Sequence, residues 1–220
     1  MMKLIVCSKP DTISDEPKLV QEMMSVGLTH FHLRKPTFSK EKLKSWLEQL
    51  SIEEQEKIVL HSHWSLATQF PLRGLHFGAS ILKDMQPKEQ QDWWSYAKKK
   101  ELTISSSVHN QEEINRLPLG LDYVWLSPIF ESISKAGYHS AYSTPQVDAW
   151  TKEMQERKQT TVFALGGVTA SHLKELRQRG FNGAVVVGTV WKDIRGLKDK
   201  EILKQRIEQL ITSCKTNTIS

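Results

Sequence analysis

Two glycine-containing turns near the end of the chain carry the clearest chemical signal in the sequence. Residues 161–190 read TTVFALGGVTASHLKELRQRGFNGAVVVGTV: an apolar strand, a Gly166-Gly167 turn, an amphipathic helix, and a second apolar strand ending at Gly188-Thr189. Bare backbone N–H groups at a strand end, next to a helix start, form a receptor for an anion such as phosphate. The sequence therefore predicts a phosphate site at these two turns.

A basic side chain follows another short apolar run. Strand alternation puts His32 and Arg34 on one face, and Phe31 and Leu33 on the other. If the apolar pair packs against helices, the polar pair faces a shared pocket, where a guanidinium is costly unless an anion pairs with it. Arg34 is thus a candidate partner for a substrate anion, with a salt bridge to a neighbouring loop as the alternative.

Histidines recur on the next two apolar runs. His61 and His63 share one face of the third run, so a divalent metal ion is conceivable there, although no carboxylate follows a neighbouring run. His76 lies in the fourth run, where a hydrogen-bonded core histidine is the alternative. We expect no bound metal and include His32, His61 and His76 as further members of the pocket.

A histidine after the fifth apolar run is the best candidate for acid/base chemistry. Ser107 and His109 share a face, and His109 comes just before an acidic helix start. A histidine at a strand end titrates near neutral pH and can move a proton. The alternative is a solvent-exposed neighbour of a helix N-cap.

The segment after the sixth run offers further phosphate contacts. Ser132, Ser134 and Lys135 fall within four positions. Such a loop can fold over a phosphate, with the lysine as a point charge. Serine-rich loops are common, so this signal gains weight only together with the two glycine turns.

The candidate residues follow different strands, so they can form one site only in a fold that brings the ends of these strands together. Eight strand-like runs alternate with eight helical patterns, which predicts a parallel sheet with crossover helices. The expected strands are residues 3–8, 30–35, 57–63, 74–78, 103–108, 123–128, 161–167 and 183–188. The expected helices are residues 16–25, 39–50, 65–70, 88–100, 111–116, 145–157, 171–179 and 199–213. Eight units favour a single-domain (β/α)₈ TIM barrel over a doubly wound open sheet, with the chemistry at the carboxyl ends of the strands.

Composition limits the class of protein further. A chain of 220 residues with 39% hydrophobic residues suits one domain, expected over residues 1–213, with a polar tail at 214–220. The net charge of +5 favours anionic small substrates, but the positive charges are dispersed, so we expect no nucleic-acid partner. No run is long enough to span a membrane, and the opening segment is interpreted as a strand. Cys7 and Cys214 match no metal or redox motif; a buried free thiol is expected at Cys7, and a cytoplasmic location for the protein.

The order and spacing of these pieces resemble the thiamin phosphate synthase and thiazole tautomerase family along nearly the whole chain. The matching pieces are His32-Leu33-Arg34, residues 74–78, Ser107-Val108-His109, Asp122-Tyr123-Val124, residues 127–130, Ser134-Lys135, residues 165–168 and residues 183–190. The resemblance implies a (β/α)₈ barrel that binds a phosphorylated thiazole. It also brings a homodimer into consideration.

This chain departs from the synthase branch of that family where the branch binds Mg²⁺. The resemblance implies an aspartate after the third strand, where Ser62 stands, and a second one after the fourth, where Gly78-Ala79-Ser80-Ile81 carries no carboxylate. Mg²⁺ needs carboxylate oxygens, and the departing pyrophosphate of the synthase reaction needs Mg²⁺. We therefore expect no cofactor, with Mg²⁺ only if the chain is a synthase.

The tautomerase branch of the family is similar at the remaining positions. Its histidine in a Ser-Val-His segment corresponds to His109. The resemblance thus implies a metal-independent thiazole tautomerase as the first hypothesis and thiamin phosphate synthase as the alternative. A metal-dependent hydrolase using His61 and His63, or a non-catalytic thiazole phosphate-binding protein, are further alternatives.

Overall fold

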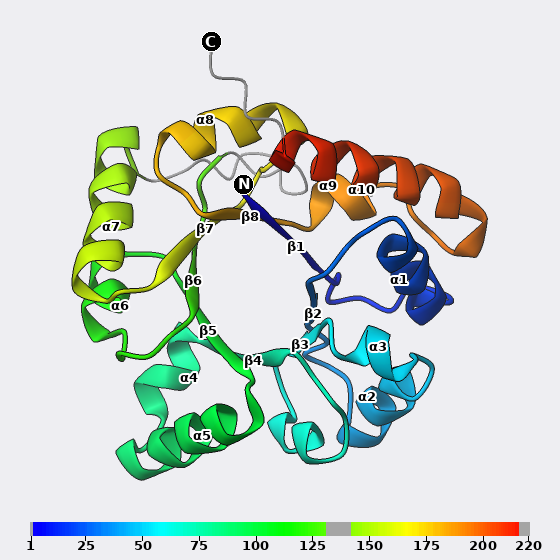
Figure 1. Cartoon of the computed structure of the whole chain (residues 1–220), viewed down its shortest axis with the longest axis horizontal. Coiled ribbons are helices and arrows are strands. Elements are labelled where there is room, and N and C mark those ends of the chain that lie inside the picture. Colours follow the sequence, from blue (N-terminus) through cyan, green and yellow to red (C-terminus); the bar gives the residue numbers. More distant parts are fainter. Residues whose placement is uncertain (1, 131–141, 216–220) are drawn as a thin grey trace.

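The chain forms a closed barrel of eight parallel strands surrounded by helices, as the computed structural model describes for residues 2–130 and 142–215 (Figure 1). The strands are β1 (Lys3–Cys7), β2 (Phe31–Leu33), β3 (Ile58–Leu60), β4 (Gly74–Gly78), β5 (Thr103–Val108), β6 (Tyr123–Leu126), β7 (Thr161–Leu165) and β8 (Gly183–Val186). Pairing of β1 with β8 closes the ring, from Lys3 opposite Gly183 to Val6 opposite Val186. The predicted (β/α)₈ barrel is confirmed, and the open sheet is excluded.

The helices form the outer layer of the molecule. They are α1 (Glu16–Ser25), α2 (Lys40–Leu47), α3 (Ile52–Gln55), α4 (Ala79–Asp84), α5 (Pro87–Lys100), α6 (Gln111–Arg116), α7 (Thr144–Arg157), α8 (Leu173–Gln178), α9 (Gly188–Trp191) and α10 (Lys200–Lys215). Short 3₁₀ helices cover Trp64–Thr68, Ala170–His172 and Leu197–Asp199. The first of these stands where a short helix was expected at residues 65–70. The helices α3, α4 and α9 were not predicted.

Strand alternation separates two apolar cores. Outward-facing side chains such as Phe31 and Leu33 pack under the helices in the larger core. A smaller core fills the barrel interior with Ile5, Cys7, Tyr123, Trp125, Phe163 and Val185. Gly183 makes room for the Phe163 ring, because a Cβ at this position would lie 1.8 Å from a ring carbon. These side chains pack the barrel interior.

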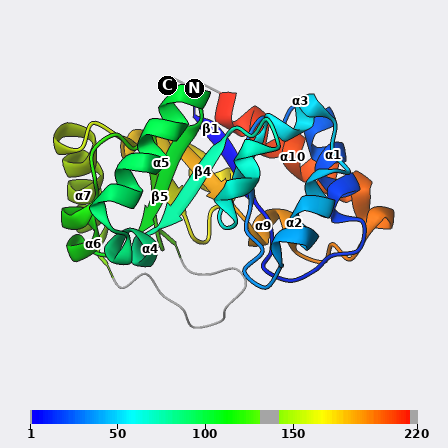
Figure 2. The ribbon, with the colours of Figure 1, turned by 90° about the horizontal axis from the view of Figure 1, so that it is seen from below.

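The carboxyl ends of the strands meet at one end of the barrel. In Figure 2 the strands run downward from the N-terminus, so their carboxyl ends point to the lower edge, near α4, α6 and α9. This lower edge is the mouth of the barrel. Among the described residues predicted to carry chemistry, Arg34, His61, His109 and the two glycine turns follow a strand, whereas His32, His76 and Ser107 lie within one.

The last helix runs further than the sequence indicated. α10 continues through Lys215, two residues into the expected tail, because Cys214 is buried and its carbonyl accepts hydrogen bonds from the Met2 N–H and from Arg177. Both cysteines are free and buried, as expected for Cys7. Within residues 2–130 and 142–215, none of the helices combines the length and the apolar character that crossing a membrane requires.

Candidate functional site

Arg34 lies at the mouth of the barrel, just past the end of β2. Phe31 and Leu33 pack in the outer core and His32 points into the barrel, as the alternation predicted. The backbone at Arg34 is fixed by Ser8, whose hydroxyl accepts from the Arg34 N–H at 2.8 Å and donates to its carbonyl at 3.0 Å. The side chain itself is exposed, so the guanidinium is free to meet a ligand.

Three histidines from neighbouring strands meet inside the barrel beneath Arg34. His32 Nδ1 lies 2.9 Å from His61 Nε2, and the ring centroids of His61 and His76 are 4.1 Å apart. His32 Nε2 lies 2.8 Å from the Tyr123 hydroxyl, and His76 Nδ1 lies 2.9 Å from Ser105 Oγ. His32, His61 and His76, predicted only as members of a pocket, thus form one group joined by a hydrogen bond between His32 and His61 and by ring contacts with His76, which we call the histidine cluster.

Burial holds the rings of the histidine cluster in the neutral form. Desolvation lowers the pKa of His32 and of His61 well below the usual histidine value, with further lowering from the adjacent ring of His76. Desolvation, followed by the charge of Arg34, lowers the pKa of His76 to about 3. Neutral imidazoles each keep one nitrogen lone pair at neutral pH.

His63 does not belong to this cluster, contrary to the expectation that it would share a face with His61. β3 ends at Leu60, and His63 adopts a left-handed conformation with φ of 52°. That backbone turn ends the strand alternation and directs His63 Nε2 to the carbonyl of Phe38, 2.9 Å away. The predicted pair for a metal-dependent hydrolase is therefore wrong.

His109 stands on the rim, after the end of β5. Its side chain is 53% exposed, and its Nδ1 lies 3.1 Å from Glu113 Oε2, which also accepts the His109 backbone N–H at 2.6 Å. Asn110 caps α6 by accepting from the Glu113 N–H at 2.9 Å. His109 is thus a neighbour of a helix N-cap and, at the same time, one half of a histidine–carboxylate pair with its Nε2 available. Ser107, two residues earlier, is partly exposed at the mouth.

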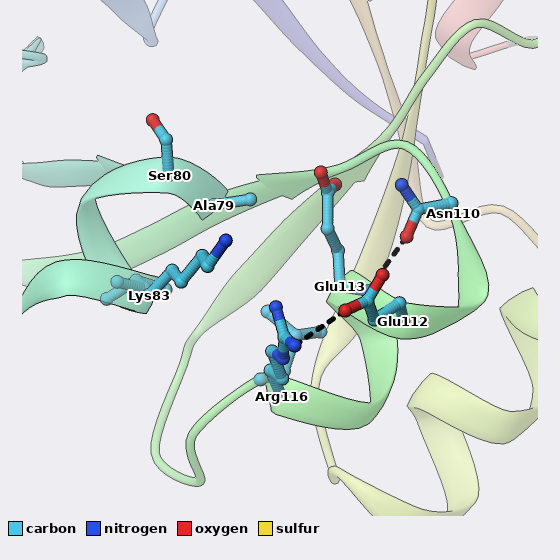
Figure 3. A pocket seen from close by; sticks show the side chains of 9 residues that line it. Ala79, Ser80, Lys83, Asn110, Glu112, Glu113 and Arg116 are labelled. Carbon is cyan, nitrogen blue, oxygen red and sulfur yellow. Dashed lines mark hydrogen bonds and ion pairs between the residues drawn. The ribbon is translucent and has the colours of Figure 1, made fainter.

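A pocket of about 270 Å³ lies beside this pair on the rim. Figure 3 shows α4 on one side with Ser80 and Lys83, and α6 on the other with Glu113 and an ion pair of 2.5 Å between Glu112 and Arg116. Sequence reasoning missed this pocket, because α4 lacks a side-chain cap and has no buried residue that would mark it as a helix.

The two glycine turns lie side by side at the mouth. Gly166 and Gly167 have φ of 98° and 63°, and Gly188 begins α9. Thr189 Oγ1 donates to the carbonyl of Val168, which ties the turn after β8 to the turn after β7. Outside the regular elements of the described chain, no hydrogen bond uses the backbone N–H of Gly167, Gly188 or Thr189. These N–H groups are therefore available donors for an anion. Ser132, Ser134 and Lys135 lie outside the described residues.

The fold and the site define a class of protein: a (β/α)₈ barrel with a polar mouth and two adjoining glycine turns that can bind an anion. The model of the family described as thiamine monophosphate synthase matches residues 2–190. The chain therefore belongs to the thiamine monophosphate synthase family.

Individual relatives agree with this assignment. The thiamine-phosphate synthase of Staphylococcus haemolyticus is 24% identical over 184 residues, covering 80% of this chain and 81% of that protein. The one of Synechococcus sp. WH7803 is 28% identical over 145 residues, but the match covers 66% of this chain and only 38% of that longer protein. Among solved structures, thiamine phosphate pyrophosphorylase from Bacteroides thetaiotaomicron superposes with a TM-score of 0.75 at 28% identity, over 96% of this chain and 97% of that one.

The residues after β3 and β4 do not fit Mg²⁺. Ser62 follows β3, and its buried hydroxyl has no hydrogen-bond partner in the described part of the chain. Asp84, the nearest carboxylate after β4, is exposed at the end of α4. Across residues 2–130 and 142–215, the one group of three or more candidate metal ligands consists of histidines alone. Mg²⁺ prefers carboxylate oxygens, so these residues do not form a Mg²⁺ site.

Proposed function

We propose that the chain binds a thiazole phosphate at the mouth of the barrel. Family membership supports this ligand, and the free N–H groups at Gly167, Gly188 and Thr189 support a phosphate at the turns after β7 and β8. The exposed guanidinium of Arg34 supplies a cation for the carboxylate or the phosphate of the ligand.

Proton transfer is the reaction that the side chains at the mouth support best. The observation that carries this proposal is the absence of a carboxylate at the ends of β3 and β4, within the described residues, which removes the usual partner of Mg²⁺. The His109–Glu113 pair supplies what an isomerisation needs, a base oriented by a carboxylate. In the tautomerase reaction His109 Nε2 takes a proton from one position of the thiazole and returns it to another, so no atom is gained or lost.

Coupling of a pyrimidine diphosphate to the thiazole phosphate is the second candidate, and the names of the relatives favour it over proton transfer. All three relatives described above are named for the synthase or pyrophosphorylase reaction. Coupling releases pyrophosphate, whose charge must be neutralised. On this chain Arg34, Lys83 and Arg116 are exposed cations at the rim that could contribute.

The first test is the substitution His109→Gln, with His63→Gln as the matched control because His63 points away to the Phe38 carbonyl. A positioned imidazole contributes about 10²–10⁴-fold, so we expect a loss of that size in the rate at which the non-aromatic thiazole phosphate carboxylate becomes aromatic. The ultraviolet absorbance of the ring follows the reaction. Full activity in a folded His109→Gln protein would exclude the proposed base.

The second arm of the experiment separates the candidates. Both substrates and Mg²⁺ are supplied to the wild-type chain, and pyrophosphate release is measured. Robust release would favour coupling over proton transfer. Tight binding of thiazole phosphate by calorimetry, with neither reaction observed, would identify a non-catalytic binding protein.

A further inference from the structure

We propose that His32, His61 and His76 form a binding site for a divalent transition-metal ion, with Zn²⁺ as the first candidate. One ring nitrogen from each of these residues lies within 4.8 Å of the other two. The three residues come from β2, from the end of β3 and from β4, so the barrel itself holds them together. This site goes beyond the proposed function and departs from the sequence expectation of no metal.

One distance within the histidine cluster is close to that of a metal centre, and the other ligand nitrogens lie within 4.8 Å of one another. Zn²⁺ binds imidazole nitrogen at about 2.0–2.1 Å, which sets ligand atoms about 3.3 Å apart in a tetrahedron. His32 Nδ1 and His61 Nε2 are now 2.9 Å apart and share one proton. A metal ion that replaces this proton moves the two nitrogens apart by only a few tenths of an ångström. The stacked His61 ring must also turn slightly away from His76, and its partial exposure leaves it space to do so.

The second ring nitrogens of His32 and His76 have partners that orient these two rings. His32 Nε2 faces the Tyr123 hydroxyl and His76 Nδ1 faces Ser105 Oγ, so His32 Nδ1 and His76 Nε2 are left for the metal. Metal-binding histidines use their second nitrogen in this way, which fixes the tautomer and the ring orientation.

The kind of metal follows from the ligands. Three imidazoles and no carboxylate suit Zn²⁺, Cu²⁺ or Ni²⁺ and not Mg²⁺ or Ca²⁺. Three neutral ligands leave both positive charges of the ion uncompensated, and Arg34 adds another near the mouth. A fourth ligand to such an ion would therefore be an anionic oxygen, such as hydroxide or a carboxylate.

Metal binding by the full chain tests this proposal directly. Protein stripped with a chelator is titrated with Zn²⁺ by calorimetry and with Co²⁺ by visible absorbance, in a buffer free of phosphate. We expect one ion per chain and the intense visible bands of four-coordinate Co²⁺. Absence of these bands and of Zn²⁺ binding would show that the histidine cluster is only a hydrogen-bonded core.

Substitutions then locate the ion. His61→Gln should lower Zn²⁺ affinity at least 100-fold, whereas His63→Gln should leave it unchanged because His63 lies outside the cluster. Tyr123→Phe removes the partner of His32 Nε2 and should weaken binding about 10–100-fold. Wild-type affinity in His61→Gln would overturn the site. If His61→Gln does not fold, the Co²⁺ spectrum of Tyr123→Phe decides: bands and affinity identical to the wild type would count against it.

Discussion

At the scale of single residues, two adjacent basic side chains at the end of β2 have opposite roles. Arg34 is exposed at the mouth, whereas Lys35 is buried with its side chain 0% exposed. Lys35 Nζ lies 2.7 Å from Glu16 Oε2 and donates to the carbonyls of Lys9 and Asp11 at 2.8 and 2.7 Å. All three of its donors are therefore used, and Lys35 ties the segment after β1 to α1.

Removal of Lys35 tests this structural role. Lys35→Met leaves the Glu16 carboxylate buried with the indole N–H of Trp46 as its remaining partner, so we expect a loss of about 3–5 kcal/mol of unfolding free energy. The matched control is Lys18→Met, which breaks an exposed pair with Asp15 and should cost about 0–1 kcal/mol. Urea unfolding measures both. Equal effects of the two substitutions would show that burial of the Lys35 pair has no energetic consequence.

At the scale of elements, the sequence predicted which segments form strands better than where they end. β4, β5, α1 and α6 have the predicted bounds, because glycine, an N-cap or a change of periodicity marks their ends. β2 and β3 are shorter than predicted. The sequence pattern of polar residues after a strand is the same whether the strand continues through them or the chain turns. The left-handed turn at His63 has a positive φ, which is uncommon for any residue other than glycine, so the residue type did not predict it.

The same limit applies to the candidate site. Arg34 and the inward histidines followed from alternation along β2 and β4, which depends only on the sequence period. The pairing of His109 with Glu113 is local, between residues four positions apart at the start of α6. The pocket beside α4 depends instead on how α4 and α6 meet at the rim, and no local pattern encodes that contact.

The turn after β7 has a backbone conformation that favours glycine. Gly166 has φ of 98°, and a Cβ there would lie 3.0 Å from Pro128 Cα, because the segment after β6 is held against this turn by hydrogen bonds from Ile129 and Phe130. Gly166→Ala should therefore cost about 2–3 kcal/mol, from backbone strain and the clash together. Phosphate-ligand affinity should fall as well if the turn is the anion receptor.

Two other glycines separate these causes. Gly180 also has a positive φ, 87°, but open space around its Cβ position, so Gly180→Ala should show strain alone, about 1 kcal/mol. Gly78 has neither feature, and Gly78→Ala should be close to neutral. Thermal and urea unfolding of the three variants gives the order. If Gly166→Ala lowers the free energy of unfolding no more than Gly180→Ala does, the segment at Pro128 moves aside without an energetic cost.

At the scale of the whole molecule, the two cysteines report on different parts of the barrel. Cys7 lies in the interior core, and burial raises the pKa of its thiol to about 12. Cys214 lies on the last described turn of α10, and burial raises the pKa of its thiol to about 11. Both thiols stay protonated in the folded chain at pH 8, and the thiolate is the reactive form. Labelling therefore requires opening of the structure around each cysteine.

Opening should proceed from α10 inward. Helix ends unfold locally with a small free energy, whereas exposure of Cys7 requires rupture of the closed ring of strands. We expect a thiol reagent at pH 8 to modify Cys214 well before Cys7, and both at once in urea, as peptide mass spectrometry would resolve. The variants Cys214→Ala and Cys7→Ala each remove one labelling reaction and so show which cysteine it belongs to. If Cys7 reacts as fast as Cys214 under native conditions, the barrel and α10 open as one unit. In that case the ring of strands does not stay closed once α10 has detached.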